Sequence, residues 1–457
     1  MKSLIIYIVL ALGGQQSWSQ TQAKNVDKPN ILLIVVDDLG YADLSSYGSN
    51  DMETPHIDNL VTSGMKFSNF HANSSVCSPT RASILTGCYS DIAGVPGVIR
   101  TDPLKNWGYL SKSAILLPKI LKSINYHSAI IGKWHLGLES PNIPNDRGFD
   151  IFHGFLGDMM DDYYTHLRHN KNYMRFNKEE ISPKGHATDI FSNWACDYIY
   201  ERAKTEVPFF LYLAFNAPHF PIQPPPKWLA KVNKKHPEIS DKRARLVALI
   251  EHLDAAVGDV INALKESGVY DNTLIIFTSD NGGSLKLGAN NGNLRDGKGS
   301  MYEGGLRIPA CVVWPNHIKS GIQNSNLFLT MDIFPTILEA VGIQPSESID
   351  GSSFLSVAKG QSNTIKDRTV FFCRKEGGLQ FAGKNSNALI SGKWKLIQNT
   401  PFSELELFDL NKDTLEENNV IEKEKDQFKN LIKKLQFHNQ EAGKIPWQSE
   451  SISFEHD

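Results

Sequence analysis

Four short runs of apolar, mostly β-branched residues constrain the fold of this 457-residue chain more than any other feature. Continuous apolar runs of this length are typical of strands that are buried on both faces of a parallel sheet. Helical segments separate them, so the alternation predicts an α/β fold with a large mixed, mostly parallel sheet flanked by helices. The runs are Ile31–Val36, Ser128–Ile131, Phe209–Phe215 and Leu274–Thr278, and the helical segments include Ile115–Ser123, Asp189–Arg202 and Asp241–Ser267.

The pattern of elements changes near residue 365. Short strands are expected at Thr369–Cys373, Ala388–Ile390 and Lys393–Gln398, joined by turns rich in Gly and Asn. Lys423–Asn439 then has the apolar spacing of an amphipathic helix. We therefore expect a large domain over residues 28–365 and a smaller C-terminal α+β subdomain, an antiparallel sheet with a helix, over residues 366–457.

Residues 1–19 have the pattern of a secretory signal peptide. Lys2 precedes an apolar core over Leu4–Leu12, and Ser17 and Ser19 are small residues at the positions that favour cleavage after Ser19. The apolar run is too short to span a bilayer, which takes about 20 residues. We expect an exported protein, periplasmic or secreted, without a transmembrane anchor.

Polar residues follow three of the predicted strands at the point where each one ends. In open α/β sheets, ligands bind outside the carboxyl ends of the strands, so these residues are expected to share one site. An aspartate alone is more often a turn or cap residue, but two such groups in the same setting favour a hard cation, calcium or magnesium. The oxygen donors are Asp37, Asp38, Asp280 and Asn281, and the third strand end carries His219.

The segment from Cys77 to Gly87 predicts a helix with a reactive residue at its start. Pro79 suits the first turn of a helix, and Gly87 suits its end. Cys77 would lie at the N-terminus, where the helix dipole favours a negative species, with Arg81 one turn further on. A buried structural cysteine is the ordinary alternative, and we prefer it for Cys88, Cys196, Cys311 and Cys373.

Two further segments carry cationic side chains. In extended geometry Lys133 and His135 point to the same face, where they could hold an anion and move a proton. A surface lysine and a hydrogen-bonded structural histidine explain the same pair equally well. Lys298 lies in a glycine-rich loop, and on its own it would be taken for a surface lysine.

Taken together, these segments resemble the sulfatase family, the formylglycine-dependent type I enzymes with an alkaline-phosphatase-like fold. Cys77-x-Pro79-x-Arg81, continued by Leu85-Thr86-Gly87, is similar to the highly specific family signature. The resemblance runs from about Pro29 to the C-terminus, and Cys88 is a departure at a position where many relatives carry a polar residue. The other matching segments are Asp37–Gly40, Gly132–Gly137, Ala217–His219, Ser279–Gly282, Lys298 with Glu303–Gly305, and Gly392–Leu396.

The resemblance implies a catalytic role for each of these side chains. A separate formylglycine-generating maturation enzyme would convert Cys77 to 3-oxoalanine (formylglycine), and a hydroxyl of the hydrated aldehyde would attack the sulfur of a sulfate ester. His219 with Lys298 would protonate the leaving alcohol, and His135 would take a proton from the second hydroxyl to expel sulfate. Arg81, Lys133, Lys298 and the metal would balance the charge of the sulfate oxygens.

The resemblance also implies the ligands. Calcium is the usual family metal and magnesium is possible, and the implied ligands are Asp37, Asp38, Cys77, Asp280 and Asn281. Substrate would be bound by Lys133, His219, Lys298 and Arg374.

The substrate is expected to be a sulfated carbohydrate, because Arg374–Gly378 and Trp394–Leu396 resemble bacterial sulfatases that act on polysaccharides such as carrageenan. The polar stretch Tyr163–Arg168 could also contact a sugar, although a surface loop explains it equally well. A net charge of −3 with a pI near 6.5 gives no basic field for nucleic acid. Two alternatives stay open, a phosphate or phosphonate ester hydrolase of the same fold and a non-catalytic protein that binds sulfated glycans.

Overall fold

The computed structural model describes residues 28–102, 106, 109–344, 349–362, 367–376 and 384–445. The expected signal peptide, residues 1–19, and the expected domain boundary near residue 365 lie outside these ranges. Among the described helices, none combines the length and the apolar character that crossing a membrane requires.

The large sheet has ten strands in the order β13-β2-β12-β11-β1-β10-β4-β5-β8-β9. Its five central strands, from β11 to β5, run parallel, and the neighbours at either side, β12 and β8, run antiparallel to them. The predicted mixed, mostly parallel sheet is therefore confirmed. The strands are β1 (Asn30–Val36), β2 (Met65–Phe67), β4 (His127–Lys133), β5 (Ile151–Phe155), β8 (Met174–Phe176), β9 (Glu179–Glu180), β10 (Phe209–Ala214), β11 (Thr273–Ser279), β12 (Ala310–Val313) and β13 (Ile322–Asn324).

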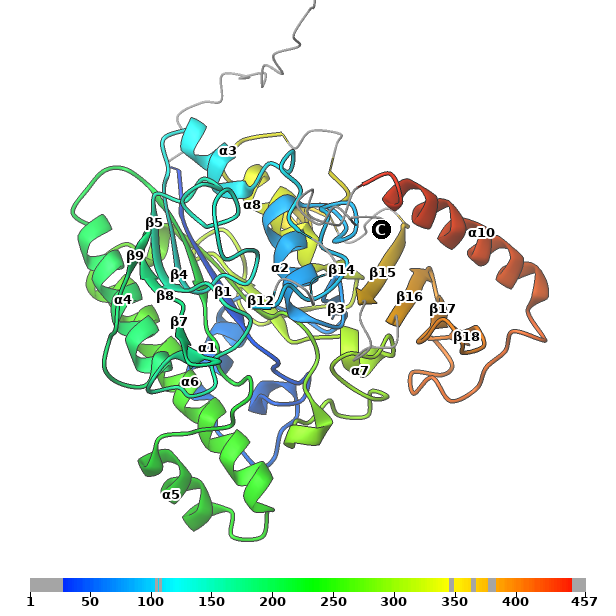
Figure 1. Cartoon of the computed structure of the whole chain (residues 1–457), viewed down its shortest axis with the longest axis horizontal. Helices are drawn as coiled ribbons and strands as arrows, with labels where there is room; N and C mark the ends of the chain where they lie inside the picture. The colour runs from blue at the N-terminus through cyan, green and yellow to red at the C-terminus, as the bar shows by residue number, and fades with distance from the viewer. Residues whose placement is uncertain are drawn as a thin grey trace, which may run out of the picture.

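Helices cover both faces of this sheet (Figure 1). Side chains alternate along β1, so Ile31 and Leu33 pack into the core formed with α2, α3 and α8, whereas Leu32 and Ile34 pack into the core formed with α1, α4 and α6. This two-sided burial explains why the central strands are continuously apolar. The helices are α1 (Pro55–Ser63), α2 (Cys77–Thr86), α3 (Leu117–Ser123), α4 (Ala187–Arg202), α5 (Pro226–Lys235), α6 (Asp241–Glu266), α7 (Glu303–Leu306), α8 (Ile333–Ala340) and α9 (Leu355–Ala358).

The C-terminal part forms a second sheet of four antiparallel strands, on the right in Figure 1. The amphipathic helix expected at Lys423–Asn439 is α10 (Lys425–Ala442), and its Leu431 and Leu435 pack on one face of this sheet. The other face packs on the large domain through Met301, Leu306 and Met331. The strands are β15 (Thr369–Glu376), β16 (Lys384–Ser391), β17 (Trp394–Gln398) and β18 (Glu406–Asp409).

A buried ion network joins the two sheets. Lys395 of β17 lies 2.7 Å from a carboxylate oxygen of Glu303 in α7 and 2.8 Å from one of Glu416. His71 and Arg307 also contact Glu303, at 3.0 and 2.7 Å. Burial opposes ionisation of Glu303, but Lys395, His71 and Arg307 together hold its pKa well below the usual value. Since Glu303 lies just after Lys298 in the chain, the network also anchors the loop that carries Lys298.

Candidate active site

The carboxyl ends of four neighbouring parallel strands meet at one edge of the large sheet. Asp37 and Asp38 follow β1, Lys133 ends β4, His219 follows β10, and Asp280 follows β11. Backbone hydrogen bonds from Asp37 to Ala217 and from Asp280 to Val36 extend the pairing beyond the strands, each at 3.1 Å. The structure thus brings together the residues that the sequence places at separate strand ends.

Oxygen donors form a compact buried group at this edge. The backbone N–H of Asp38 donates to Asp280 Oδ1 at 3.2 Å, and Asn281 Nδ2 donates to Asp38 Oδ1 at 2.8 Å. The amide oxygen Oδ1 of Asn281 is buried and has no hydrogen-bond partner among the described residues. An orphaned oxygen beside three buried carboxylates is the ligand chemistry of a hard cation, so these residues fit Ca²⁺ or Mg²⁺.

The carboxyl groups differ in their titration. Burial opposes the ionisation of Asp37, but Lys133, His219 and Arg81 outweigh it and hold its pKa well below the usual value. Burial, and next the charge of Asp37, raise the pKa of Asp280 to about 7.

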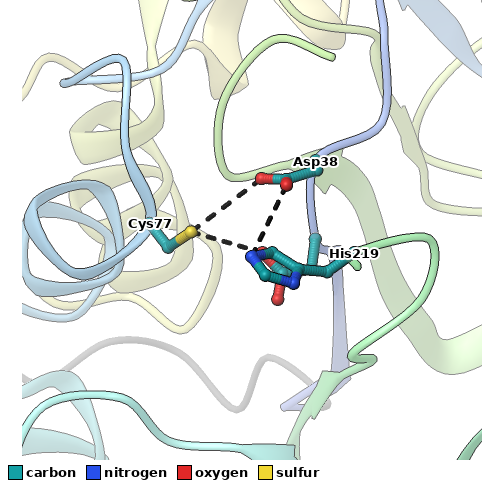
Figure 2. A group of neighbouring side chains, drawn as sticks. Asp38, Cys77 and His219 are labelled. Atoms are coloured by element: carbon teal, nitrogen blue, oxygen red, sulfur yellow. Dashed lines mark hydrogen bonds and ion pairs between the residues drawn. The ribbon is translucent and has the colours of Figure 1, made fainter. Parts of the chain in front are cut away.

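Cys77 is the first residue of α2, and its side chain points at the carboxylates (Figure 2). The thiol donates to Asp37 Oδ1 at 3.4 Å and lies 3.9 Å from Asp38 Oδ1. Burial, followed by the charges of Asp280 and Asp37, raises the pKa of this thiol well above its usual value. Burial and the two carboxylates therefore oppose the negative charge on the thiol that the helix N-terminus would favour.

Two buried cations flank Asp37. Arg81 donates to Asp280 Oδ2 through Nε at 2.9 Å, and its Nη2 lies 2.7 Å from the same oxygen and 3.7 Å from Asp37 Oδ1. Lys133 Nζ lies 2.5 Å from Asp37 Oδ2. Both side chains are fully buried and contact carboxylate oxygens, which fixes their positions at the base of the site.

His135 reaches the site by a different path from the one expected. The extended geometry predicted for Lys133 and His135 is wrong, because β4 ends at Lys133 and His135 has a left-handed backbone with φ of 61°. Its Nε2 donates to the carbonyl oxygen of Ile99 at 2.8 Å, and its Nδ1 is buried without a hydrogen-bond partner within the described ranges. Burial, then Lys133 and Arg81, lower the pKa of His135 well below the usual value. Both effects disfavour the charged ring, and in its neutral form Nδ1 is an acceptor nitrogen without a partner among the described residues.

His219 and Lys298 both approach Asp38 Oδ2. Lys298 Nζ donates to Asp38 Oδ2 at 2.7 Å, and His219 Nε2 lies 3.6 Å from the same oxygen. His219 Nδ1 donates to the carbonyl oxygen of Phe220 at 2.7 Å, so Nε2 is the ring nitrogen that faces the site. Burial and then Lys298 lower the pKa of His219.

Other expected contact residues fall in different places. Tyr163 and His166 are buried, and Arg168 pairs with Asp158 and Asp161, whereas Tyr164 is 41% exposed. Cys88 follows the C-terminal end of α2, whereas Cys77 begins that helix.

Arg374 lies at the end of β15, beside the loop that carries Lys298, and its Nη1 donates to the carbonyl oxygen of Gly299 at 3.2 Å. Sequence reasoning missed Lys384, whose Nζ donates to the same oxygen at 3.2 Å. No local motif marks Lys384, because the pairing of β15 with β16 brings it there.

Comparison with protein families assigns the chain to one of them. A family model described as Sulfatase matches residues 29–343. The chain belongs to the sulfatase family. A second model, described as N-sulphoglucosamine sulphohydrolase, C-terminal, matches residues 296–442 of this sulfatase. The activity of the family is that of a sulfuric ester hydrolase.

Relatives and solved structures agree with this assignment. The N-acetylgalactosamine-6-sulfatase of Sus scrofa is 33% identical over 76% of this chain and 68% of its own length, and the Arylsulfatase A of Bos taurus is 33% identical over 75% and 70%. The crystal structure of Ps i-CgsB in complex with k-i-k-neocarrahexaose has a TM-score of 0.84 and 32% identity, and covers 93% of this sulfatase and 95% of its own chain.

The phosphonate monoester hydrolase of Agrobacterium radiobacter has the same fold, with a TM-score of 0.66 at 20% identity. A second metal would need further ligands, for which the sequence offers His252 and Asp254. In the structure Asp254 accepts the backbone N–H groups of His56 and Ile57, and His252 pairs with Asp189 at 2.6 Å. Neither residue joins the carboxylates around Cys77.

Proposed function

We propose that this sulfatase hydrolyses the sulfate esters of a sulfated oligosaccharide or polysaccharide with a formylglycine derived from Cys77 and one divalent cation. The observation that carries the proposal is the position of Cys77, 3.4 Å from Asp37 within a ring of fixed positive charges. A formylglycine-generating maturation enzyme is the partner that this chemistry requires.

The side chains around Cys77 support a division of labour. Arg81, Lys133 and Lys298 are fixed cations that can hold the sulfate group and offset the charge that develops on its oxygens. His219 presents Nε2 toward Asp38 and can deliver a proton to the departing sugar hydroxyl, with Lys298 as the other candidate donor. His135 has a free acceptor nitrogen that can take a proton when sulfate leaves. The hydrated formyl group supplies the oxygen nucleophile when the modification is present.

The metal would be held by Asp37, Asp38, Asp280 and Asn281, next to position 77. The bound ion would supply positive charge that keeps these buried carboxylates ionised and polarises the oxygen nucleophile. Calcium is the first expectation, and magnesium suits the same oxygen ligands.

The substrate class is supported by the relatives and by the rim of the site. Ps i-CgsB was crystallised with k-i-k-neocarrahexaose, a carrageenan fragment, which makes a sulfated galactan of the carrageenan type the first candidate here. Phe220 follows His219 and is 48% exposed, so it offers an apolar surface beside the leaving group that could stack on a sugar ring. Arg374 is a further candidate contact. Export through residues 1–19 would bring the enzyme to such polymers outside the cell.

The test is sulfate release from a panel of defined sulfated oligosaccharides, with mass analysis of the Cys77 peptide from the same preparation. Desulfation that depends on the aldehyde form supports the proposal. Release of phosphate or phosphonate in preference to sulfate would favour the ester hydrolase alternative. An unmodified Cys77 with retained glycan binding would favour the non-catalytic alternative.

A further inference from the structure

Two cationic side chains from the C-terminal sheet meet on one backbone oxygen beside the catalytic loop. Arg374 Nη1 and Lys384 Nζ each donate to the carbonyl oxygen of Gly299 at 3.2 Å. Gly299 directly follows Lys298, whose amine lies 2.7 Å from Asp38. A Cβ atom at Gly299 would lie 2.5 Å from Arg374 Nη1, so only glycine lets the guanidinium approach this closely.

The charge around this oxygen is unbalanced. Glu376 is the paired acid, but its carboxylate is divided between Arg374 Nε, at 2.6 Å, and Arg100. Lys384 has no ion pair within the described part of the chain, and the sequence of residues 377–383 contains no acid. Burial and then Arg374 lower the pKa of Lys384, against weaker opposing effects of Glu376 and Asp296.

Such an arrangement suits an anionic ligand. Two cations that share one neutral acceptor repel each other, and an anion between them would relieve that repulsion. The guanidinium fork of Arg374 matches the geometry of a sulfate or carboxylate group, and its side chain is 13% exposed, so a ligand can reach it.

We propose that Arg374 and Lys384 form a subsite for a second anionic group of the saccharide, distinct from the sulfate ester that is cleaved. The proposal rests on the proposed function. Both cations bind the carbonyl oxygen of Gly299, and consecutive Cα atoms are about 3.8 Å apart. The subsite therefore lies next to Lys298. The second group therefore belongs to the sugar that carries the scissile ester or to the adjoining one. The preferred substrate is then a saccharide with a sulfate or a uronate carboxylate in addition to the ester that is hydrolysed.

The test compares three matched oligosaccharides, one with a single sulfate ester, one with an added sulfate and one with an added uronate. The variants are Arg374→Gln and Lys384→Gln, which keep a hydrogen-bond donor near Gly299. Lys393→Gln is the control, because Lys393 pairs with Asp409 near the β16–β17 turn of the same sheet. In each Gln variant kcat/KM on a doubly anionic saccharide should fall about tenfold to a hundredfold more than on the singly sulfated one. The control should alter none of the three.

If the loss of kcat/KM is larger on the saccharide with the added sulfate, the second group is a sulfate. If the loss is larger on the saccharide with the added uronate, the second group is a carboxylate. Equal losses on all three saccharides would overturn the proposal and leave both residues as supports of the Lys298 loop. Absence of any loss would overturn it as well. If the wild-type enzyme releases sulfate from none of them, the proposed function fails separately. Calorimetric binding of the same saccharides to wild type and Lys384→Gln then still decides whether the subsite exists.

Discussion

The hydroxyl oxygen of Tyr163 lies 2.9 Å from the backbone carbonyl oxygens of both Asn216 and His219, so its one proton can be donated to either or shared between them. The side chain is 1% exposed, so it holds the His219 loop from the interior of the protein. Gln223 strengthens the same connection, because its side chain accepts from the backbone N–H of Tyr163 at 2.8 Å and donates to Asp162 at 2.7 Å. A residue that first appeared to be a candidate sugar contact is thus a support of the candidate acid.

Replacing Tyr163 by Phe should therefore impair catalysis without removing a group that contacts substrate. Loss of the hydroxyl removes the one donor that links Tyr163 to this loop, at a cost of about 1 kcal/mol, and loosens the His219 loop. We expect kcat on a sulfated glycan to fall about tenfold with little change in KM. Steady-state kinetics measures both values, and Tyr164→Phe is the matched control because Tyr164 is exposed. A purely structural role would instead lower the melting temperature and leave kcat per folded molecule intact.

His219→Ala should harm the hydrolysis of poor leaving groups most. A sugar hydroxyl needs a proton as it departs, whereas a nitrophenol leaves almost unaided, so the loss should be about 10²–10⁴-fold larger on the glycan. Parallel assays with a sulfated glycan and an activated aryl sulfate give the ratio. Losses of the same size on both substrates would reject the acid role and leave Lys298 as the donor.

Cys77→Ala should abolish turnover and leave the fold and the binding of sulfated glycan largely intact. The thiol lies over the carboxylates and supplies no core packing that alanine cannot approximate. Cys88→Ala is the control, since Cys88 follows the C-terminal end of α2, and it should remain active. Sulfate release by the Cys77→Ala protein would contradict the mechanism. Cys77→Ser should be active only where the maturation enzyme of the host accepts serine.

Removal of divalent metal should lower both the activity and the melting temperature. Asp37, Asp38 and Asp280 are buried close together, since Asp37 and Asp38 share a contact with Cys77 and Asp37 and Asp280 share one with Arg81. Without a metal ion their mutual repulsion destabilises the folded state. Addition of calcium after chelation should restore both properties, because an ion that binds only the folded state stabilises it. Elemental analysis that finds no calcium or magnesium in fully active protein would refute the metal site.

Lys395→Met should destabilise the protein by about 3–5 kcal/mol, because it leaves Glu303 and Glu416 buried without their shared counter-charge. Lys393→Met removes a partly exposed ion pair with Asp409 and should cost at most about 1 kcal/mol. Urea denaturation of the two variants compares these costs directly. Similar midpoints for both would show that the buried network contributes little.

The sequence predicted the features that depend on local patterns. The apolar runs gave β1, β4, β10 and β11 within a few residues of their observed ends, because burial on both faces demands uninterrupted apolar side chains. The polar residues after those strands could be assigned to one edge because parallel strands end together. These two rules were enough to gather Asp37, His219 and Asp280 into one site.

What the sequence could not provide depends on contacts between distant segments. The left-handed backbone at His135 lies just after the end of β4, where the backbone N–H of His135 donates to the carbonyl oxygen of Leu156. No periodicity in the sequence encodes this contact. Lys384 reaches Gly299 only through the register of β15 with β16. Tyr163 looked like a surface residue because its neighbours are polar, yet the fold buries it under a loop more than fifty residues away.

The ion network around Glu303 also limits which C-terminal sheets can be exchanged between sulfatases. The C-terminal sheet supplies Lys395 to the segment that follows Lys298, so the two sheets share the loop of this candidate site residue as well as an interface. A graft of a C-terminal sheet from a relative would succeed only if it brought a cation to the position of Lys395. Recombination is therefore restricted to partners that preserve this charge, whereas Arg374 and Lys384, near the ends of β15 and β16, lie outside this ion network.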